Sequence, residues 1–511
     1  MSKSYKKIFV VNSLAGWGSK IFQILCMLIL TPLLLSGLGK ERYGAWILVG
    51  QLAAYLMMLD LGVSSSIARY YARHMAEEDI LSNKHLYSTA TFILSSVGFV
   101  VILISWFARN YVAYFYEVEA SIYRDFTVAL VLSGLCLAVT LPFRVFMGIL
   151  QAYHKLYYVD LSIFISSLVK FIGIIYLNYF WHWSLTNLAY ILLVSEFSKY
   201  LLMSVFVKHL SGAVTNFSFE YVSWKMTSKI YSLGIASFFS SLLKTVRQQA
   251  PITLVGKVFG LGMVPVISIP LSVLRNVGAL IGRIGTVFTA VSSELDAVGK
   301  KDRIASLNIE VTRLLLSVTF AGALLIVFFS QSALSLWLRD NIDKNSLVLI
   351  SKSLSILVMP YFIYVSMTGL SNTLMATGHH FRIVTATAVI ILICFPFFFV
   401  FMDNVINVSY IISVTLLIMS FYLVYQFSCY LDKSFRYVFG SIFYRPLCFG
   451  MLLVLSFWPI RRFLGSELIE ILFFCVMAIV YFALTVEQKH RGLILTTLGF
   501  SRYGQNNAES P

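Results

Sequence analysis

Four basic residues lie at helical spacings inside two long apolar stretches of the sequence, where a charged side chain is costly. Lys244 and Arg247 are three residues apart, and Arg275 and Arg283 are eight apart, so each pair falls roughly on one face of a helix. Neither stretch contains an acidic residue. A guanidinium group binds phosphate through two parallel hydrogen bonds, and a lysine adds a mobile positive charge. The pattern predicts a binding site for an anion such as a pyrophosphate group.

Lys20 and Lys170 also lie within apolar stretches, and we assign both to the same predicted anion site. Lys199 has a different explanation, because Glu196 precedes it by three residues and the two can form an ion pair on one helix. Basic residues near the ends of apolar stretches are expected to extend toward the membrane surface, and these are Arg144, Arg313 and Lys352. The predicted anion site therefore consists of Lys244, Arg247, Arg275, Arg283, Lys20 and Lys170.

Two acidic residues, Asp60 and Glu196, are candidates for binding a coupling ion. A carboxyl group that is partly buried within a membrane holds a proton more readily than one in water. The coupling ion would be H⁺ or Na⁺, and no other cofactor is expected. Asp60 has an equally good structural explanation as the ion-pair partner of Lys20 or Arg69.

Motifs for catalysis or metal binding are missing from the sequence. The eight histidines lie in predicted loops or at the ends of apolar stretches, without the spacing of metal ligands. There is also no phosphate-binding loop, nucleophile elbow or dinucleotide-binding turn. We therefore expect no catalytic residue and no metal site, and we expect that the protein is not an enzyme.

The composition indicates that lipid surrounds most of the chain. Of its 511 residues, 59% are hydrophobic and only 12% are charged, whereas soluble proteins have about 45–50% apolar and about 25% charged residues. A helix needs about 20 apolar residues to cross a bilayer. The sequence predicts an all-α polytopic membrane protein with about 14 spans, or 12 if the last two do not cross. The predicted spans are 14–36, 44–68, 87–108, 126–149, 159–178, 186–207, 230–256, 262–290, 312–338, 348–375, 383–402, 408–430, 444–460 and 466–486.

The distribution of basic residues predicts the orientation of these spans. The basic start is followed by an apolar stretch to Leu35 without a cleavage site of small residues, which indicates a retained first span. If the N-terminus is cytoplasmic, about twenty basic residues of the loops face the cytoplasm and about nine face the other side. Both termini are therefore expected in the cytoplasm. The net charge of +16 is spread among these loops, so it does not indicate nucleic-acid binding.

Self-similar features indicate an internal repeat. Three features recur at an offset of about 219 residues, and the pairs are Pro32 and Pro251, Glu77–Leu86 and Asp296–Ala305, and Pro142 and Pro360. A histidine follows the fourth span of each half, at His154 and at His379–His380, and its larger offset predicts a small insertion in the span 348–375. An even number of helices per half gives both halves the same orientation. The prediction is two six-helix lobes, 1–215 and 216–434, around a central cationic cleft, with two more helices and a cytoplasmic tail in 435–511.

Two segments near the N-terminus resemble the signature of Wzx-type polysaccharide flippases. They are TPLLLSGLGKERYGAW (Thr31–Trp46) and LDLGVSSSIARYYAR (Leu59–Arg73). These flippases belong to the multidrug/oligosaccharidyl-lipid/polysaccharide (MOP) exporter superfamily. The resemblance extends through the repeat layout, and the two extra C-terminal helices are similar to those of the lipid II branch.

The resemblance implies a function in O-antigen or capsule assembly. It implies two lobes that give alternating access, and transfer of undecaprenyl-pyrophosphate-linked oligosaccharides from the cytoplasmic to the periplasmic face of a bacterial inner membrane. The partners would be this lipid-linked sugar, the surrounding membrane lipids, and the polysaccharide polymerase with its chain-length machinery.

Two other interpretations remain open from the sequence. A cation-coupled drug or small-molecule antiporter of the same superfamily would depend on Asp60 and Glu196 instead of the cations of the spans 230–256 and 262–290. A membrane polysaccharide polymerase would use the same lipid-linked sugars, but it is expected to have a large outer loop. The longest predicted outer loop, residues 109–125, is too short for a folded domain.

Overall fold

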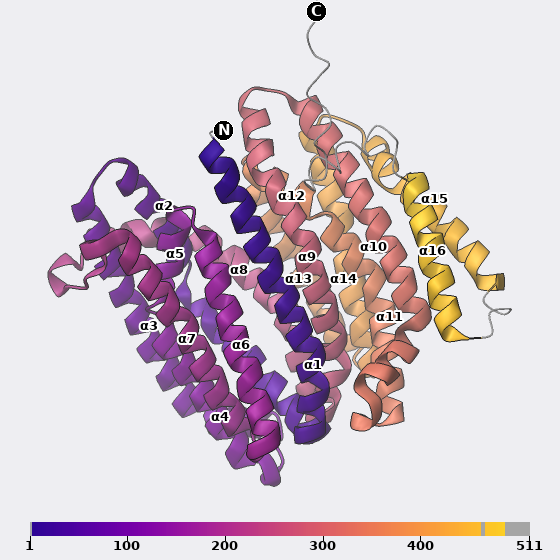
Figure 1. Ribbon diagram of the computed structural model, residues 1–511, viewed down its shortest axis with the longest axis horizontal. Coiled ribbons are helices and arrows are strands. Elements are labelled where there is room, and N and C mark those ends of the chain that lie inside the picture. The colour runs from indigo at the N-terminus through magenta and orange to yellow at the C-terminus, as the bar shows by residue number, and fades with distance from the viewer. Residues whose placement is uncertain (1–2, 461–465, 486–511) are drawn as a thin grey trace, which may run out of the picture. The chain divides into compact units, whose positions relative to one another are not determined.

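Long α-helices form almost the whole chain in the computed structural model, which describes residues 3–460 and 466–485 (Figure 1). Helices satisfy their own backbone hydrogen bonds, so they suit an apolar sequence in a membrane. Among the described residues, 11 helical segments are long and apolar enough to cross a bilayer, and the protein is a multi-pass membrane protein. The α-helices are α1 (Lys3–Leu56), α2 (Val63–Ala76), α3 (Ile80–Phe115), α4 (Ala120–Thr140), α5 (Arg144–Ala152), α6 (Leu156–Phe180), α7 (Leu185–Ser211), α8 (Trp224–Val258), α9 (Val264–Ala297), α10 (Lys301–Leu338), α11 (Lys344–Ser366), α12 (Thr368–Ala376), α13 (His380–Val400), α14 (Val405–Tyr430), α15 (Phe435–Ile460) and α16 (Glu467–Thr485). The described residues also form five short 3₁₀ helices, η1 (Met57–Asp60), η2 (Gly212–Thr215), η3 (Phe219–Tyr221), η4 (Leu261–Met263) and η5 (Arg339–Asn341).

The 14 predicted spans and the 11 candidate spans differ at three places. The first two predicted spans fall into one candidate, because α1 runs through both and is only kinked at Gly39 (φ 75°, ψ 169°). α8 is not among the 11, and its stretch includes two central cations and several serines. In α16 the apolar part is only Ile469–Val480. The predicted cytoplasmic tail, from residue 486 onward, lies outside the described residues.

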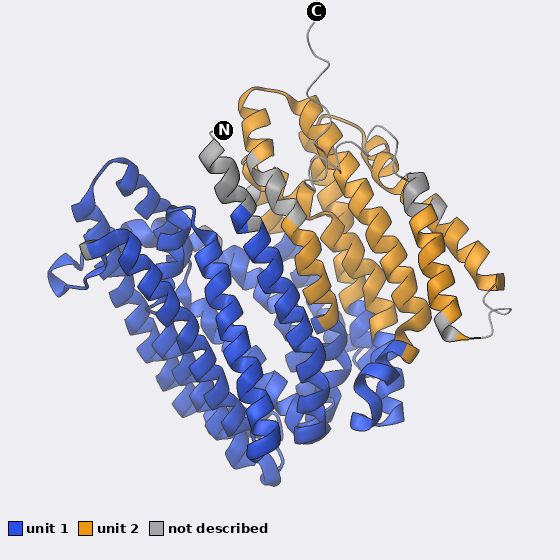
Figure 2. Ribbon diagram, in the orientation of Figure 1, with its two compact units in different colours: residues 1–272, 333–353, 387–411 blue, residues 273–332, 354–386, 412–511 orange. Residues whose placement is uncertain are grey.

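The chain divides into two compact units (Figure 2). Unit 1 comprises Met1–Ser272, Ala333–Ser353 and Thr387–Ile411, and unit 2 comprises Val273–Ser332, Leu354–Ala386 and Ile412–Pro511. In unit 1, α3 packs on α4, α4 on α7, α7 on α6 and α6 on α1, and α2 packs against α5. Its core contains the fully buried side chains Ile67, Leu86, Leu94, Leu141 and Ile149.

The core of unit 2 has two clusters of apolar side chains. In one, residues of α10 and α12 pack with residues of α14 and α15, among them Leu370, Phe427 and Val438. In the other, Phe457 of α15 and Phe474 of α16 pack against α10, with their ring centroids 5.0 Å apart. The two C-terminal helices are thus tied to α10 through aromatic packing.

Helix breaks recur in the two parts of the sequence. Gly39 and Gly260 have nearly the same dihedral angles, with φ of 75° and 82° and ψ of 169° and 167°. Such angles favour glycine, because it has no Cβ. The order of a long helix, a break and a nine-residue helix occurs twice, as α4–α5 and as α11–α12.

The positions of two prolines do not follow this recurrence. Pro142 lies in the break between α4 and α5, whereas Pro360 lies inside α11, before the break at Met367. The prediction that these prolines are equivalent is therefore wrong. Proline lacks a backbone N–H and accompanies a helix break, but it is not needed for one.

Candidate functional site

The first group of half-buried charges in unit 1 lies on α6 and α7. Lys199 and Glu196, three residues apart on α7, form the ion pair that their spacing predicts. Lys170 of α6 interacts electrostatically with the carboxylate of Glu196. The Lys199 ammonium also lies 4.6 Å from the ring centroid of Tyr200. The Glu196 carboxylate thus interacts with both lysines, and Lys199 also has the Tyr200 ring beside it, which lowers the cost of placing these charges within the helices.

The second group is an ion pair between Asp60 and Arg144. Their side chains are only 14% and 12% exposed, and Arg144 Nη1 lies 3.6 Å from Asp60 Oδ2. The backbone N–H of Ser64 donates a hydrogen bond of 3.2 Å to Asp60 Oδ1. The structure therefore gives Asp60 a structural partner, but that partner is neither Lys20 nor Arg69. Arg144 was expected to extend to the membrane surface, and instead it is buried at the first turn of α5.

A close helix contact fixes the surroundings of this ion pair. Leu61 and Gly62 both have positive φ, at 51° and 79°, and they turn the chain from Asp60 into α2. A Cβ added at Gly62 would lie 2.2 Å from the carbonyl oxygen of Gly234, so the two backbones touch. Ser66 donates a hydrogen bond of 2.8 Å to the carbonyl oxygen of Ile230. These contacts dock the first half of α8 on α2.

The predicted anion-binding residues of unit 1 differ in exposure. On α8, the side chain of Lys244 is exposed and that of Arg247 is half-buried. Lys20 of α1 is also half-buried. α8 meets α1 about two turns after Arg247, where Tyr55 and Thr253 share a hydrogen bond of 3.5 Å. An exposed lysine beside a half-buried arginine on the same helix face can bind an anion while the lysine keeps part of its hydration.

In unit 2, Arg275 of α9 has a neighbour that the sequence did not indicate. It interacts electrostatically with Tyr361 of α11. A Cβ added at Gly278 would lie 2.7 Å from Tyr361 Cε1, so this glycine gives the tyrosine ring room beside α9. Arg283, two turns after Arg275, is also half-buried. The only sequence signal for Tyr361 was its position after Pro360 within an apolar stretch.

The two cation pairs belong to different compact units, Lys244 and Arg247 to unit 1 and Arg275 and Arg283 to unit 2. Their convergence around one cleft therefore stays a prediction. By contrast, Lys170 is brought together with Glu196, and Asp60 with Arg144.

Ion pairs at the predicted outer ends of helices join distant parts of unit 1. Lys40 lies 3.2 Å from Asp343, and Lys257 at the end of α8 lies 2.8 Å from Glu117. The hydrogen bond and the charge of Lys257 lower the pKa of the Glu117 carboxyl below its ordinary value. Near the end of α10, Trp337 Nε1 donates a hydrogen bond of 2.6 Å to the carbonyl oxygen of Leu28 in α1. Early and late parts of the sequence are thereby linked at this end.

At the predicted inner end of unit 2, two ion pairs connect the same two loops. Lys301 lies 3.4 Å from Asp432, and Lys433 lies 3.2 Å from Asp302. The Tyr430 hydroxyl donates a hydrogen bond of 2.8 Å to Asp296. The start of α10 and the loop between α14 and α15 are thus held together by charges of opposite sign.

Comparison with known proteins relates the fold to transporters. No protein-family model and no curated protein matches the sequence. A structure of the lipid II flippase MurJ in an inward closed conformation is similar with a TM-score of 0.73 and 14% identity, and the match covers 95% of this chain and 100% of that chain. An inward-facing multidrug resistance MATE family transporter gives a TM-score of 0.69 at 12% identity, covering 81% and 94% of the two chains.

A MOP superfamily transporter from Pyrococcus furiosus is also similar, with a TM-score of 0.59, 15% identity, and coverage of 84% of this chain and 97% of that chain. At these identities the shared property is the fold. The protein therefore has the fold of MOP-superfamily transporters.

Proposed function

We propose that this protein is a flippase that moves undecaprenyl-pyrophosphate-linked oligosaccharide repeat units from the cytoplasmic to the periplasmic face of a bacterial inner membrane. The observation that carries this proposal is the similarity to the lipid II flippase, which covers 95% of the chain, whereas the multidrug transporters cover 81–84%. The name of that neighbour gives it a lipid as cargo, which favours a lipid-linked cargo here.

The charges within the helices favour an anionic cargo. α8 and α9 carry Lys244, Arg247, Arg275 and Arg283, and no acidic residue lies between Ser223 and Ser293. A pyrophosphate group would offset the cost of these cations, and arginine is suited to bind it through two hydrogen bonds. The Pyrococcus furiosus neighbour is described as having a binding pocket of reversed polarity that suggests a different function. A change of pocket charge between members of this fold is thus compatible with a change of cargo.

The architecture that we propose has two six-helix lobes, 1–215 and 216–434. The paired breaks at Gly39 and Gly260 and the repeated arrangement of α4–α5 and α11–α12 support an internal repeat. A parallel repeat places equivalent helices on either side of a central axis. The second lobe would then contribute both cation pairs of α8 and α9 to the cargo cleft, and the first lobe would contribute Lys20 and Lys170.

Alternating access would depend on the outer contacts of unit 1. Each of the ion pairs Lys40–Asp343 and Lys257–Glu117 links a residue of the proposed lobe 1–215 to a residue of the proposed lobe 216–434. Opening toward the periplasm would require these ion pairs and the Trp337 hydrogen bond to Leu28 to separate. Exposed ion pairs contribute little each, so they can open and close during transport.

We propose that both termini are cytoplasmic, as the basic residues of the loops predict. The partners would be the lipid-linked sugar, membrane lipids and the polysaccharide polymerase with its chain-length machinery, and nucleic acid would not be one. H⁺ or Na⁺ would be the coupling ion, and Asp60 and Glu196 are the candidate carboxylates for it.

A cation-coupled drug antiporter is the second candidate, because several neighbours in fold are multidrug transporters. In that case export of organic cations would depend on Asp60 and Glu196. Both carboxylates lie in ion pairs with buried or half-buried cations, and this leaves them less suited to bind a cationic drug. The two functions thus make opposite predictions for acidic and basic residues.

The test is transfer of a fluorescent undecaprenyl-pyrophosphate-linked oligosaccharide across liposomes that contain the purified full-length protein. We expect the wild type to transfer it, and we expect Arg247→Ala to reduce the initial rate about tenfold, since one charge-assisted contact to phosphate is lost. Lys352→Gln is the matched control, because Lys352 is exposed on α11 and its loss removes the same charge. Full transfer by the Arg247 variant would contradict the anion site.

A cellular experiment separates the proposed function from the antiporter. Depletion of the protein should cause single lipid-linked repeat units to accumulate on the cytoplasmic face of the membrane. Sensitivity to cationic drugs without such accumulation would favour the antiporter. Unpolymerised units on the periplasmic face would favour the polymerase.

A further inference from the structure

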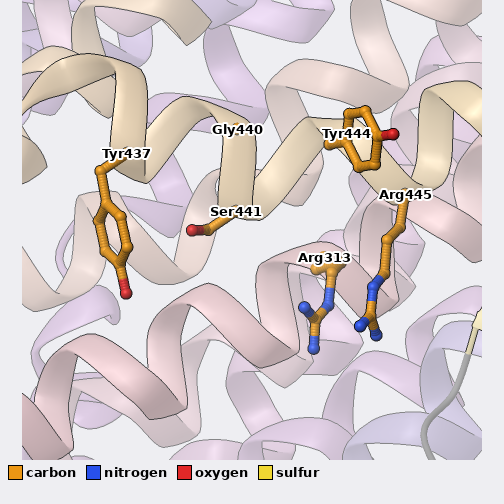
Figure 3. Close-up of a pocket in the computed structure, with 6 residues that line it drawn as sticks. All are labelled: Arg313, Tyr437, Gly440, Ser441, Tyr444 and Arg445. Atoms are coloured by element: carbon orange, nitrogen blue, oxygen red, sulfur yellow. The ribbon is translucent and has the colours of Figure 1, made fainter.

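A groove with several polar side chains lies between α10 and α15 in unit 2. It has a volume of about 370 Å³ and is lined by Arg313, Tyr437, Gly440, Ser441, Tyr444 and Arg445 (Figure 3). The residues from α15 lie three or four positions apart, so they form one face of the helix. Arg313 reaches the groove from α10. In Figure 3 the guanidinium groups of Arg313 and Arg445 extend in the same direction.

The chemistry of this lining suits a phosphate group. Two guanidinium groups and a serine hydroxyl can donate hydrogen bonds to phosphate oxygens, and no acidic residue lines the groove. An anion between Arg313 and Arg445 would also reduce the repulsion of two like charges in one groove.

The position of the groove along both helices matches the membrane surface. α10 has no charged residue after Arg313 until it ends at Leu338, and α15 has none after Arg445 until it ends at Ile460. Both arginines are therefore the last charges before an apolar run, and both belong at the boundary between hydrocarbon and headgroups. Tyr437 and Tyr444 are exposed, by 55% and 69%, as is typical of aromatic residues at this boundary.

The floor of the groove is open at Gly440. A Cβ added at this glycine would meet no heavy atom within 4 Å. Close packing of α10 against α15 therefore does not explain the glycine. A larger side chain at position 440 would occupy the groove without disturbing the backbone, and this gives a way to block the groove alone.

We propose that this groove binds the phosphate headgroup of a membrane lipid at the predicted cytoplasmic face. The lipid lies with its acyl or prenyl chains along the apolar surface that follows Arg313 on α10 and Arg445 on α15. Two sources share this chemistry, an anionic phospholipid of the bilayer and an undecaprenyl phosphate or pyrophosphate. The inference does not depend on the proposed cargo, because a phospholipid would bind in the same way in a protein with another cargo.

The experiment measures lipid binding to the purified full-length protein by native mass spectrometry in detergent. The probes are phosphatidylglycerol, phosphatidylcholine and undecaprenyl phosphate, each added alone. We expect Arg313→Gln and Arg445→Gln each to weaken one binding event for an anionic lipid about tenfold, the loss typical of one charge-assisted hydrogen bond. Phosphatidylcholine should bind the wild type and the variants equally.

Matched variants separate binding from folding. Gly440→Leu should block the groove and weaken anionic lipid binding as strongly as the arginine variants, whereas Gly440→Ala should leave it unchanged. Arg436→Gln removes an exposed arginine of α15 outside the groove and should have no effect. Thermal unfolding in lipid-free detergent should be similar for all of these variants.

The outcome assigns the lipid. A variant-sensitive event with phosphatidylglycerol supports the groove as a phospholipid site, and one with undecaprenyl phosphate supports it as a site for the carrier lipid. Equal binding of both anionic lipids by the wild type, Arg313→Gln and Gly440→Leu would overturn the proposal. Flipping that fails while groove binding persists would contradict only the proposed function.

Discussion

Two regions of the molecule place a pair of basic residues within or beside the membrane, and they differ in the space around those residues. On α6 and α7, Lys170 and Lys199 share the carboxylate of Glu196. Between α10 and α15, Arg313 and Arg445 line an open groove together with a serine and two tyrosines. The difference indicates that a cation with a carboxylate beside it stabilises the fold, whereas cations gathered around an open groove are suited to an external anion.

The α6–α7 group gives the largest expected effect on stability. Glu196→Gln leaves Lys170 and Lys199 without their shared carboxylate, and we expect a loss of about 3 kcal/mol in the free energy of unfolding. Thermal unfolding of the purified protein in detergent measures it. The double variant Glu196→Gln with Lys199→Met should recover part of the loss. If Glu196→Gln alone is as stable as the wild type, the proposed contrast between the two regions is wrong.

Asp60 extends the comparison to a buried pair of one acid and one base. Asp60→Asn keeps an oxygen to accept the hydrogen bond from Ser64 but loses the charge that faces Arg144, so we expect a loss of about 2 kcal/mol. Arg144→Gln should destabilise the protein similarly. If Asp60 instead binds the coupling ion, its replacement will abolish the dependence of flipping on an H⁺ or Na⁺ gradient, and Arg144→Gln will not.

Arg275 tests whether a cation assigned to the cargo separates activity from stability. Arg275→Ala should lower the initial flipping rate about tenfold, equivalent to about 1.4 kcal/mol, with little change in thermal unfolding. Arg275→Lys should retain part of the activity if charge alone matters, and little of it if phosphate needs the two parallel hydrogen bonds of arginine. If Arg275→Ala lowers the stability as much as Glu196→Gln does, Arg275 has a structural role like that of Lys170 and Lys199.

The smallest effect is expected at the exposed pair of Glu117 and Lys257. Because the folded protein lowers the pKa of Glu117, the pair contributes to stability above the ordinary carboxyl pKa of 4.5, and this contribution is lost as the pH falls through the lowered pKa. The difference in melting temperature between the wild type and Glu117→Gln should therefore be constant from pH 7 to about pH 5 and shrink in stronger acid. If this difference in melting temperature grows as the pH falls, the Glu117 carboxyl does not have a lowered pKa in the folded protein.

Sequence patterns predicted local features better than contacts between helices. The ion pair of Glu196 and Lys199 followed from a spacing of three residues on one helix, and it is present. Arg144 was misplaced, because its position near the end of an apolar stretch said nothing about the break between α4 and α5. That break makes Arg144 the first residue of a new helix beside Asp60. The groove at Gly440 was missed for the same reason, since its arginines come from helices more than a hundred residues apart.

The sequence by itself determined that the protein resides in a membrane and where most of its helices run, because the length and hydropathy of a segment decide whether it can cross a bilayer. It also singled out the cations of α8 and α9, since any charge in an apolar helix is costly enough to be noticed. Only the tertiary structure decided that Asp60 pairs with Arg144, that Tyr361 lies beside Arg275, and that Arg313 and Arg445 line one groove. These partners lie on different helical segments, and helix packing, which no local spacing encodes, brings them together.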